Sequence, residues 1–278
     1  MILEFIYEKL DVVPVFPKIA HRVLQMLDDP KTTIPELARV IRYDPAITAN
    51  FLKYCNSAYF GPAQKVTSLE VALSLLGQEE IRKIIMLSCS APYLNQALEG
   101  YDLSPEELWD HSMGAAVASQ ILAEAVGFSD RATLFTAALL HDIGEIVLNL
   151  FVHDFREELI QMSQEGLSFT EAEWQVLGGD HAIIGSELLR RWEFPEEIVR
   201  AIREHHDPDL FIQSDLSALV ALSDIFLREL GIGIGADGFR YHLDDRLVKK
   251  FDLSPQKVLQ LIIKVWQEFQ KIKESIAI

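Results

Sequence analysis

The sequence has little cysteine: its 278 residues include only Cys55 and Cys89. Neither cysteine belongs to a CxxC pair, so the sequence predicts neither a zinc ribbon nor a disulfide framework. Such usage fits a reducing compartment, and we expect a cytoplasmic protein. Uninterrupted apolar stretches are also missing, since nowhere do about 18 apolar residues run without a charge, which argues against a membrane span. The first residues mix acids with apolar side chains and lack the basic leader of a signal peptide.

Basic residues are in short supply too. The formal net charge is −17, from 25 lysines and arginines against 42 aspartates and glutamates. The imbalance is uneven, because residues 1–100 hold 10 basic and 11 acidic residues whereas residues 101–278 hold 15 and 31. A basic surface that could follow a phosphate backbone is therefore missing, which argues against general nucleic-acid binding. The surplus acids either serve solubility or, in part, line a cation site.

Strand signals are scarce, and helix signals recur along the whole chain. Thr33 with Glu36, and Ser104 with Glu107, have the spacing of a capping box, and Gly127 follows an apolar run as a helix-ending glycine does. Between such signals the apolar residues follow the helical period, so we expect an all-α protein with about a dozen helices. The glycine-rich segment 231–238 lacks both the GxGxxG order and the P-loop lysine, and it predicts a flexible connection.

Histidines and carboxylates that could bind a metal recur through the second half of the chain. The candidates are Glu107, His111, His141, Asp142, His181, His205, His206 and Asp224. Neutral imidazoles together with carboxylates suit iron, manganese, nickel or zinc. A carboxylate such as Asp142 can bridge two cations about 3.5–4 Å apart, and a water between them becomes a nucleophile for in-line attack on phosphorus. Helices that each donate one or two ligands build metal sites in this way.

Most of these candidates also have a plainer interpretation. Glu107 can act as a capping-box partner instead of a ligand. His111 and His181 can be interior histidines that hydrogen-bond to the backbone. His205 and His206 end a predicted helix, where they can complement its dipole.

Asp224 is harder to explain without a ligand. It lies between apolar neighbours in the run LVALSDIFL, and a buried carboxylate needs a partner. The remaining histidines, His21, His153 and His242, fit no pattern, and we expect them to be exposed or structural.

Residues 141–144 read HDIG, and with the histidines around them they resemble the HD superfamily of metal-dependent phosphohydrolases. The order of the candidates is most similar to the HD-GYP branch, which hydrolyses cyclic dinucleotides. That resemblance implies that the metal ligands are His141, Asp142, His181, His205, His206 and Asp224. Glu107 and His111 fall at the upstream helix positions of the same branch.

The first half of the chain resembles the HDOD family. The segments FPKIAHRVLQMLDDP, IPELARVIRYDPAITANFLKYCNSAYFG and VTSLEVALSLLGQEEIRKIIM are similar in order to that family's segments. HDOD proteins are bacterial and usually have signalling or regulatory roles, and many lack the HD catalytic set. The resemblance implies a multi-helix HD-like bundle with an N-terminal helical subdomain. We expect an N-terminal helical part over residues 1–104, a part with the metal site over 105–230, and a C-terminal helical extension over 231–278.

Two departures from active HD-GYP enzymes favour regulation over hydrolysis. Glu145 replaces the lysine of HDIGK, which reverses a charge beside the expected phosphate position, and the sequence DPD at 207–209 stands where Gly-Tyr-Pro would be. We therefore expect a regulatory protein that binds one or two divalent transition metals and has little or no hydrolase activity.

Two alternatives to this reading remain open. One is an active phosphohydrolase of a nucleotide or cyclic dinucleotide, which needs a basic clamp for phosphate. The candidates for that clamp are Arg131, Arg190 and Arg191. The other alternative is a metal-free interaction module whose histidines are relics.

The expected partner is a signalling protein or a small nucleotide ligand. A cluster of aromatic and amide side chains near a glycine–proline turn is a candidate surface for it: Tyr54, Asn56, Tyr59 and Phe60. Such side chains are typical of recognition surfaces, although the core of a buried loop would explain them equally well.

Overall fold

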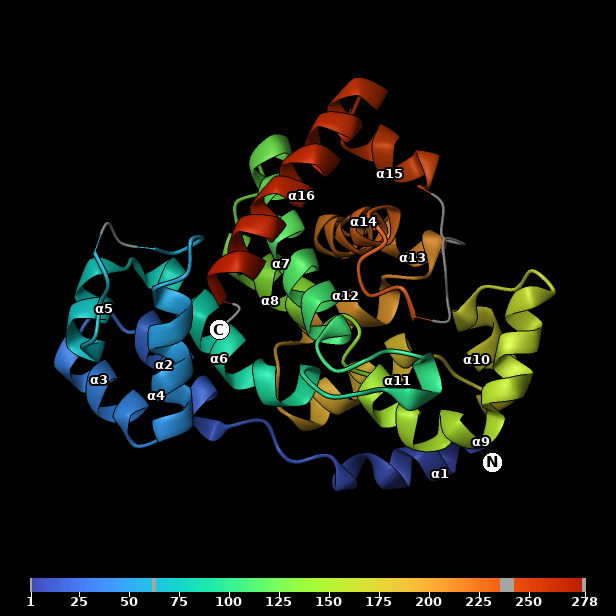
Figure 1. The fold of residues 1–278 in the computed structure, drawn as a ribbon, viewed down its shortest axis with the longest axis horizontal. Helices are drawn as coiled ribbons and strands as arrows, with labels where there is room; N and C mark the ends of the chain where they lie inside the picture. The colour runs from blue at the N-terminus through green and yellow to red at the C-terminus, as the bar shows by residue number, and fades with distance from the viewer. Residues whose placement is uncertain (1, 62–63, 236–242, 277–278) are drawn as a thin grey trace. The chain divides into compact units, whose positions relative to one another are not determined.

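The computed structural model describes residues 2–61, 64–235 and 243–276. These residues form sixteen α-helices and two short 3-10 helices, with no strand among them, so the expected all-α fold is confirmed (Figure 1). The elements in order are α1 (Ile2–Lys9), η1 (Leu10–Val12), α2 (Lys18–Asp28), α3 (Ile34–Arg42), α4 (Pro45–Cys55), α5 (Leu69–Leu75), α6 (Gln78–Leu94), η2 (Glu99–Tyr101), α7 (Glu107–Val126), α8 (Arg131–Leu140), α9 (Glu145–Gln164), α10 (Phe169–Leu177), α11 (His181–Arg191), α12 (Glu196–Glu204), α13 (Pro208–Phe211), α14 (Asp215–Glu229), α15 (Asp245–Lys250) and α16 (Pro255–Ile276).

The helices divide into two compact units, and neither unit is continuous in sequence. The larger unit comprises Met1–Val15 and Pro92–Trp266, and the smaller unit comprises Phe16–Ala91 and Gln267–Ile278. These divisions differ from the boundaries expected at residues 104 and 230. Two of them fall inside the long helices α6 and α16. A helix that continues through a boundary shows no change of composition there, so the sequence carries no signal for it.

The helix α7 is central to the larger unit. Its residues from His111 to Ala123 are all buried, and α8 and α14 pack along it. The small side chains of the sequence GAAVAS let neighbouring helices approach closely, as the dense packing of an interior requires. The helix ends at Gly127, whose φ of 75° is the left-handed conformation that glycine adopts at a helix C-terminus.

One apolar stretch of the larger unit, Arg131–Val152, has the length and composition of a membrane-crossing helix. It covers α8 and the start of α9, and 83% of its most apolar window is buried inside the fold. Helices that are apolar all round are expected in the core of a large helical unit, so packing explains this stretch.

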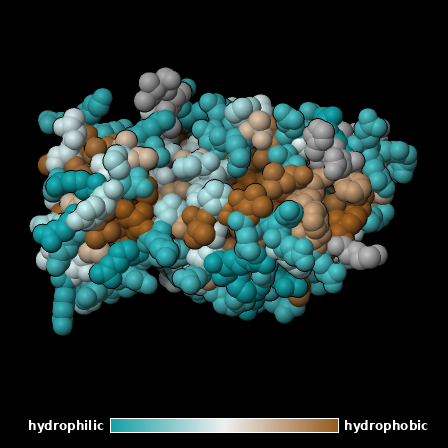
Figure 2. Space-filling model, turned by 90° about the horizontal axis from the view of Figure 1, so that it is seen from below, coloured by the Kyte–Doolittle hydropathy of each residue, from teal (hydrophilic) through white to brown (hydrophobic). Residues whose placement is uncertain are grey.

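The N-terminal segment of the larger unit leaves apolar side chains at the surface. Phe5 of α1 is 49% exposed, and Val12 and Val15 are more exposed still. Figure 2 looks at the side of the molecule on which α1 lies and shows brown, apolar side chains among the teal ones. Phe5 also packs edge-to-face against Phe151 of α9, with ring centroids 5.8 Å apart. This contact holds α1 on α9.

In the smaller unit, helix caps agree with the sequence, whereas the predicted recognition surface agrees only in part. The capping box of Thr33 and Glu36 is present at the start of α3. The predicted surface is wrong for Tyr54, which is only 4% exposed. Asn56 is half-buried, and its amide accepts from the backbone N–H of Val66 at 2.7 Å and donates to the carbonyl oxygen of Val66 at 2.8 Å, which closes a loop; its role toward a partner stays a prediction.

The other two residues of that surface, Tyr59 and Phe60, are half-buried, with ring centroids 4.7 Å apart in an edge-to-face pair. Their role toward a partner stays a prediction.

Candidate metal centre

Seven of the eight candidate ligands converge inside the larger unit. Their ligand atoms form two groups, each with all atoms within 4.8 Å of one another. One group is Asp142, His181, His205 and His206, and the other is His111, His141, Asp142 and Asp224. Asp142 belongs to both groups, and every member except the half-buried His206 is fully buried. Residues up to 113 positions apart in the chain therefore supply one interior cluster of imidazoles and carboxylates.

Helix ends position three of these histidines, and helix packing positions the other ligands. His141 is the C-cap of α8, His205 is the C-cap of α12, and His181 is the first residue of α11. His111 lies in the first turns of α7, and Asp224 lies in the middle of α14, which packs on α7. The bundle thus brings one or two ligands from each of five helices or helix ends to the same place.

A hydrogen bond at Nδ1 orients four of the histidines. The Nδ1 atoms of His111, His141 and His205 lie 2.7, 2.8 and 2.5 Å from the carbonyl oxygens of Ile232, Ala138 and Ile202. The Nδ1 of His181 lies 2.9 Å from the carboxylate of Glu173. Because a carbonyl or carboxylate oxygen only accepts, Nδ1 carries a proton, and Nε2 is the atom that faces the centre. Histidines that bind metals are held in this way.

The four Nε2 atoms point at one carboxylate. They lie 3.0–3.4 Å from the oxygens of Asp142. Yet Asp142 Oδ1 and His205 Nε2 are buried atoms without a hydrogen-bond partner in the part of the chain that the structure describes. A buried polar atom left in this state costs about 1–3 kcal/mol, so it indicates a ligand or ion that completes the site.

Two close contacts between ring nitrogens support the same conclusion. The Nε2 atoms of His111 and His141 lie 3.2 Å apart, and those of His181 and His206 lie 2.9 Å apart. Two lone pairs at such distances repel unless a proton or a cation lies between or beside them. The donor set of imidazole nitrogens and carboxylate oxygens fits a divalent transition metal.

The carboxylates of the cluster stabilise positive charge. Burial by itself lowers the pKa of His141, but Asp142 and Asp224 more than offset this effect and raise it to about 10. Burial also acts to lower the pKa of His181, while Glu173 and Asp142 raise it well above its usual value. Burial, by contrast, lowers the pKa of His205 and of His206. The carboxylates thus favour positive charge around His141 and His181, and a divalent cation supplies such charge.

Three further buried residues support the site, and the sequence did not predict them: Tyr101, Glu173 and Arg228. Glu173 is fully buried and accepts three hydrogen bonds: from the backbone N–H of His181 at 3.0 Å, from its Nδ1 at 2.9 Å, and from the Tyr101 hydroxyl at 2.5 Å. The buried Arg228 donates from Nε to Asp224 at 2.7 Å. The spacing of four residues between Asp224 and Arg228 was a usable signal, whereas nothing near Glu173 in the sequence marks its role.

The glycine of HDIG allows two elements to approach closely. A Cβ atom at Gly144 would lie 1.9 Å from the carbonyl oxygen of His181 and 2.6 Å from the backbone nitrogen of Gly185. Only a residue without a side chain fits there, because both neighbours are backbone atoms. Gly144 therefore sets how near α9 and the start of α11 lie, and so where His181 stands relative to Asp142.

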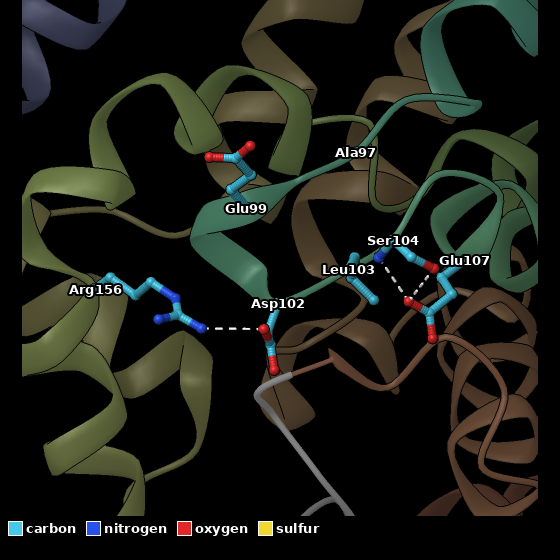
Figure 3. Close-up of a pocket in the computed structure, with 7 residues that line it drawn as sticks. All are labelled: Ala97, Glu99, Asp102, Leu103, Ser104, Glu107 and Arg156. Carbon is cyan, nitrogen blue, oxygen red and sulfur yellow. Dashed lines mark hydrogen bonds and ion pairs between the residues drawn. The ribbon is translucent and has the colours of Figure 1, made fainter.

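Glu107 is the candidate that the structure does not bring to the cluster. Its carboxylate reaches back to Ser104 and accepts from the backbone N–H and the hydroxyl of that residue, both at 2.6 Å. The N-cap of α7 is Glu106, so only the Glu107 half of the expected capping box is present. Figure 3 shows this pair in a separate cavity of about 510 Å³, together with Asp102 and Arg156, which form an ion pair. Glu107 is thus a helix-start residue in a surface cavity.

Glu145 is buried beside the cluster, at 7% exposure, and its Oε2 atom has no hydrogen-bond partner. Burial, followed by the charge of Asp142, raises the pKa of Glu145 well above its usual value. The expected repulsion of an anionic substrate requires an ionised Glu145, so burial weakens that argument. It also excludes the simple alternative that Glu145 points to solvent.

Residues 231–235, where the sequence predicts a flexible connection, make close contacts with α7. The backbone at Gly233 has a φ of 60°, and a Cβ there would lie 2.6 Å from the carbonyl oxygen of Glu107. This close approach to α7 accompanies the contact of the Ile232 carbonyl with His111. The rest of the segment, and His242, lie outside the described residues, as does the side chain of His153.

The three arginines considered for a phosphate clamp bind protein groups elsewhere. Arg131 donates to the carbonyl oxygen of Gln120 at 3.2 Å. Arg190 and Arg191 lie at the surface and pair with Glu187 and Asp11. None of the three is among the residues around the cluster.

Comparison with known proteins identifies the family. The HDOD domain model matches residues 13–208. The chain belongs to the HDOD family. The match covers most of the chain and includes the HDIG motif, His181, His205 and His206.

Curated relatives of this HDOD protein are longer than the chain. An uncharacterized protein of Treponema pallidum is 26% identical over 209 residues, which are 73% of this chain and 39% of that protein. Ribonuclease Y of Mycoplasma mycoides is 26% identical over 138 residues, which are 50% of this chain and 25% of that protein. The chain thus spans well under half the length of these relatives.

Solved structures share the fold. An HDOD domain protein of unknown function from Geobacter sulfurreducens matches with a TM-score of 0.77 and 23% identity, over 98% of this chain and 96% of that one. A Shewanella amazonensis protein, provisionally named a metal-dependent phosphohydrolase, matches with a TM-score of 0.60 and 18% identity, over 99% and 97%. At such identities the likeness establishes the fold.

Proposed function

We propose that this HDOD protein is a regulatory protein whose interior centre binds two divalent transition metals that share Asp142. The observation that carries the proposal is the pair of orphaned buried atoms, Asp142 Oδ1 and His205 Nε2. They face each other in a cluster of imidazoles whose Nδ1 atoms are already bonded. The two atoms lie 3.4 Å apart, and neither has a hydrogen-bond partner among the described residues, which leaves both available to a metal ion.

Each ion would take four protein ligands. His181, His205 and His206 would join Asp142 around one ion, and His111, His141 and Asp224 would join it around the other. When bound, such a pair of metals can acidify a water molecule for attack on phosphorus. Around them, Glu173 holds the His181 ring and Arg228 holds Asp224.

A regulatory role is supported by the lack, among the described residues of the cluster, of a free basic side chain that could bind an anionic substrate. Arg228, the buried arginine of the cluster, is committed to Asp224 at 2.7 Å and lies 3.8 Å from Asp142. No lysine follows HDIG, and residues 101–278 carry 31 acids against 15 basic residues. We therefore propose little or no hydrolase activity in the wild type. A phosphohydrolase is the second candidate, favoured by the shared carboxylate.

The first test is the metal content of protein purified without added metal. Plasma emission spectroscopy should find iron, manganese, nickel or zinc at one to two ions per chain. Asp142→Asn, which keeps the shape of the side chain, should lose most of that metal, whereas the exposed Asp209→Asn should keep it. If the wild-type protein neither contains metal nor takes it up on incubation, the proposed metal centre is refuted. The metal-free interaction module is then the remaining interpretation.

The second test separates regulation from hydrolysis. Manganese- or iron-loaded protein is incubated with a mononucleotide, a cyclic dinucleotide and a generic phosphodiester, and the products are separated by chromatography. The proposal expects negligible turnover. Sustained turnover by the wild type that is lost in Asp142→Asn would establish the phosphohydrolase instead.

A further inference from the structure

A pocket of about 340 Å³ lies at the surface next to the candidate metal centre. It borders His206, the one member of the cluster that is not fully buried. The walls come from α10, the start of α11, the end of α12 and the loop into α13. The volume falls near the lower end of small-molecule sites, which span ~300–1,000 Å³. A small ligand that meets the centre would enter here.

The acidic side chains of this pocket are already committed. Glu171 closes the capping box of α10, Asp180 caps α11 and Asp207 caps α13. Each carboxylate accepts hydrogen bonds from backbone N–H groups at a helix start, and these groups offset its charge. The pocket is therefore less hostile to an anion than three acids would suggest.

The basic side chain of this pocket is uncommitted. Arg203 lies near the end of α12, is exposed, and forms no ion pair among the described residues. Six other arginines of the larger unit pair with carboxylates: Arg156, Arg190, Arg191, Arg200, Arg228 and Arg246. Arg203 thus offers a free guanidinium three residues before His206, and guanidinium groups bind phosphate in a bidentate manner.

An aromatic ring also lines the pocket. Trp174 of α10 is 50% exposed, and its indole N–H donates to Asp180 at 2.9 Å. The hydrogen bond fixes the ring while leaving part of its surface to the solvent. A flat aromatic surface held in this way stacks on planar ring systems such as nucleobases.

We propose that this pocket binds a small phosphorylated molecule with a planar aromatic ring, which is the chemistry of a nucleotide. Trp174 stacks on the ring, and Arg203 pairs with the phosphate next to His206. The inference rests on the proposed function, because it names the ligand class that the same centre meets. The modest volume favours one ring system over two, hence a mononucleotide over a cyclic dinucleotide.

The cavity that holds Glu107 does not offer the same chemistry. Its lining includes Glu99, Asp102 and Glu107, and its single arginine, Arg156, is paired with Asp102 (Figure 3). Both cavities hold three acids and one arginine, but Arg156 is already in an ion pair whereas, among the described residues, Arg203 is not. The pocket beside His206 is the better place for a phosphate.

The test is isothermal titration of metal-loaded protein with AMP, GMP and inorganic phosphate. Arg203→Gln should weaken the binding of all three by roughly tenfold, as expected for a lost hydrogen-bonded charge. Trp174→Leu should weaken nucleotide binding by about tenfold and leave phosphate binding unchanged, because only the nucleotides stack. Trp174→Phe, which keeps a ring, should retain most of the nucleotide affinity.

Matched controls and metal analysis make the outcomes distinguishable. Arg200→Gln on the same helix and Trp266→Leu on α16 change exposed residues outside the pocket and should bind as the wild type does. Equal effects of Arg203→Gln and Arg200→Gln, or no nucleotide binding by metal-containing wild type, would overturn the inference and leave the metal centre standing. Absence of metal from the same preparations would overturn the proposed function instead.

Discussion

Glu173→Gln tests whether a residue outside the ligand set organises the centre. The wild-type carboxylate receives three donors, two from His181 and one from Tyr101, in a fully buried position. Glutamine keeps one accepting oxygen and replaces the other with an NH₂ group, which cannot accept. At least one of the three donors is then left without its partner, at a cost of ~1–3 kcal/mol.

The effect of Glu173→Gln can be followed in two independent measurements, of thermal stability and of metal affinity. For a unit of this size, such a loss corresponds to a fall in Tm of roughly 2–12 °C, seen by calorimetry of the metal-free protein. The His181 ring also loses the carboxylate that fixes its tautomer and raises its basicity. Metal affinity should therefore fall by about 10–100-fold, measured by competition with a chelator of known affinity.

Two control variants separate the causes. Glu171→Gln changes an exposed carboxylate on the same helix and should leave metal affinity unchanged. Tyr101→Phe removes the hydroxyl donor alone, so it should lower stability while changing metal affinity less than Glu173→Gln does. If Glu173→Gln and Glu171→Gln bind metal equally well, the reasoning about His181 is refuted.

Three further predictions concern the same cluster. Gly144→Ala should lower both Tm and metal content, because the added Cβ would meet the His181 carbonyl oxygen. As a control, Gly127→Ala places its Cβ in open space and should cost only the ~1–2 kcal/mol of a left-handed backbone. Equal destabilisation of the two variants in calorimetry would contradict the close approach at Gly144. His205→Ala should lose metal and with it the stabilisation that metal at a hundredfold excess over Kd gives, about 2.7 kcal/mol, whereas His21→Ala should retain it in thermal melts with and without metal. Glu145→Lys should destabilise the protein more than Glu145→Gln in urea titrations, because it buries an ammonium group; a stable lysine variant would show that Glu145 can reach solvent.

The sequence predicted the fold class well because it depends on repeated local signals, whereas the ligand role of the candidate residues stays a prediction. Apolar residues at the helical period define α-helices, and capping residues such as Thr33 and Glu36 mark where they begin. His205 ends a predicted helix, as the structure also has it, and His141 and His181 likewise stand at the end of α8 and the start of α11. Their convergence was expected from the family resemblance and is now visible as distances to Asp142.

The parts that the sequence did not predict depend on contacts between distant segments. The sequence allows Glu107 to be either a partner of Ser104 at the helix start or a metal ligand. Only the structure shows that its carboxylate bonds to Ser104. Glu173 acts through its burial against Tyr101, 72 residues earlier, which no local pattern records. The unit boundaries fall inside α6 and α16, where an uninterrupted helical period conceals them.

The hydrogen bonds that His141 and His205 donate from Nδ1 affect how the centre assembles during folding. In both cases the acceptor is the carbonyl of the residue three positions earlier, Ala138 or Ile202, at the end of the same helix. Each ring can therefore adopt its tautomer and direction within a single helical turn, before any other helix has docked. The rotational entropy of these two ligands is lost locally, and the later encounter of α8 with α12 brings together side chains that already point the right way.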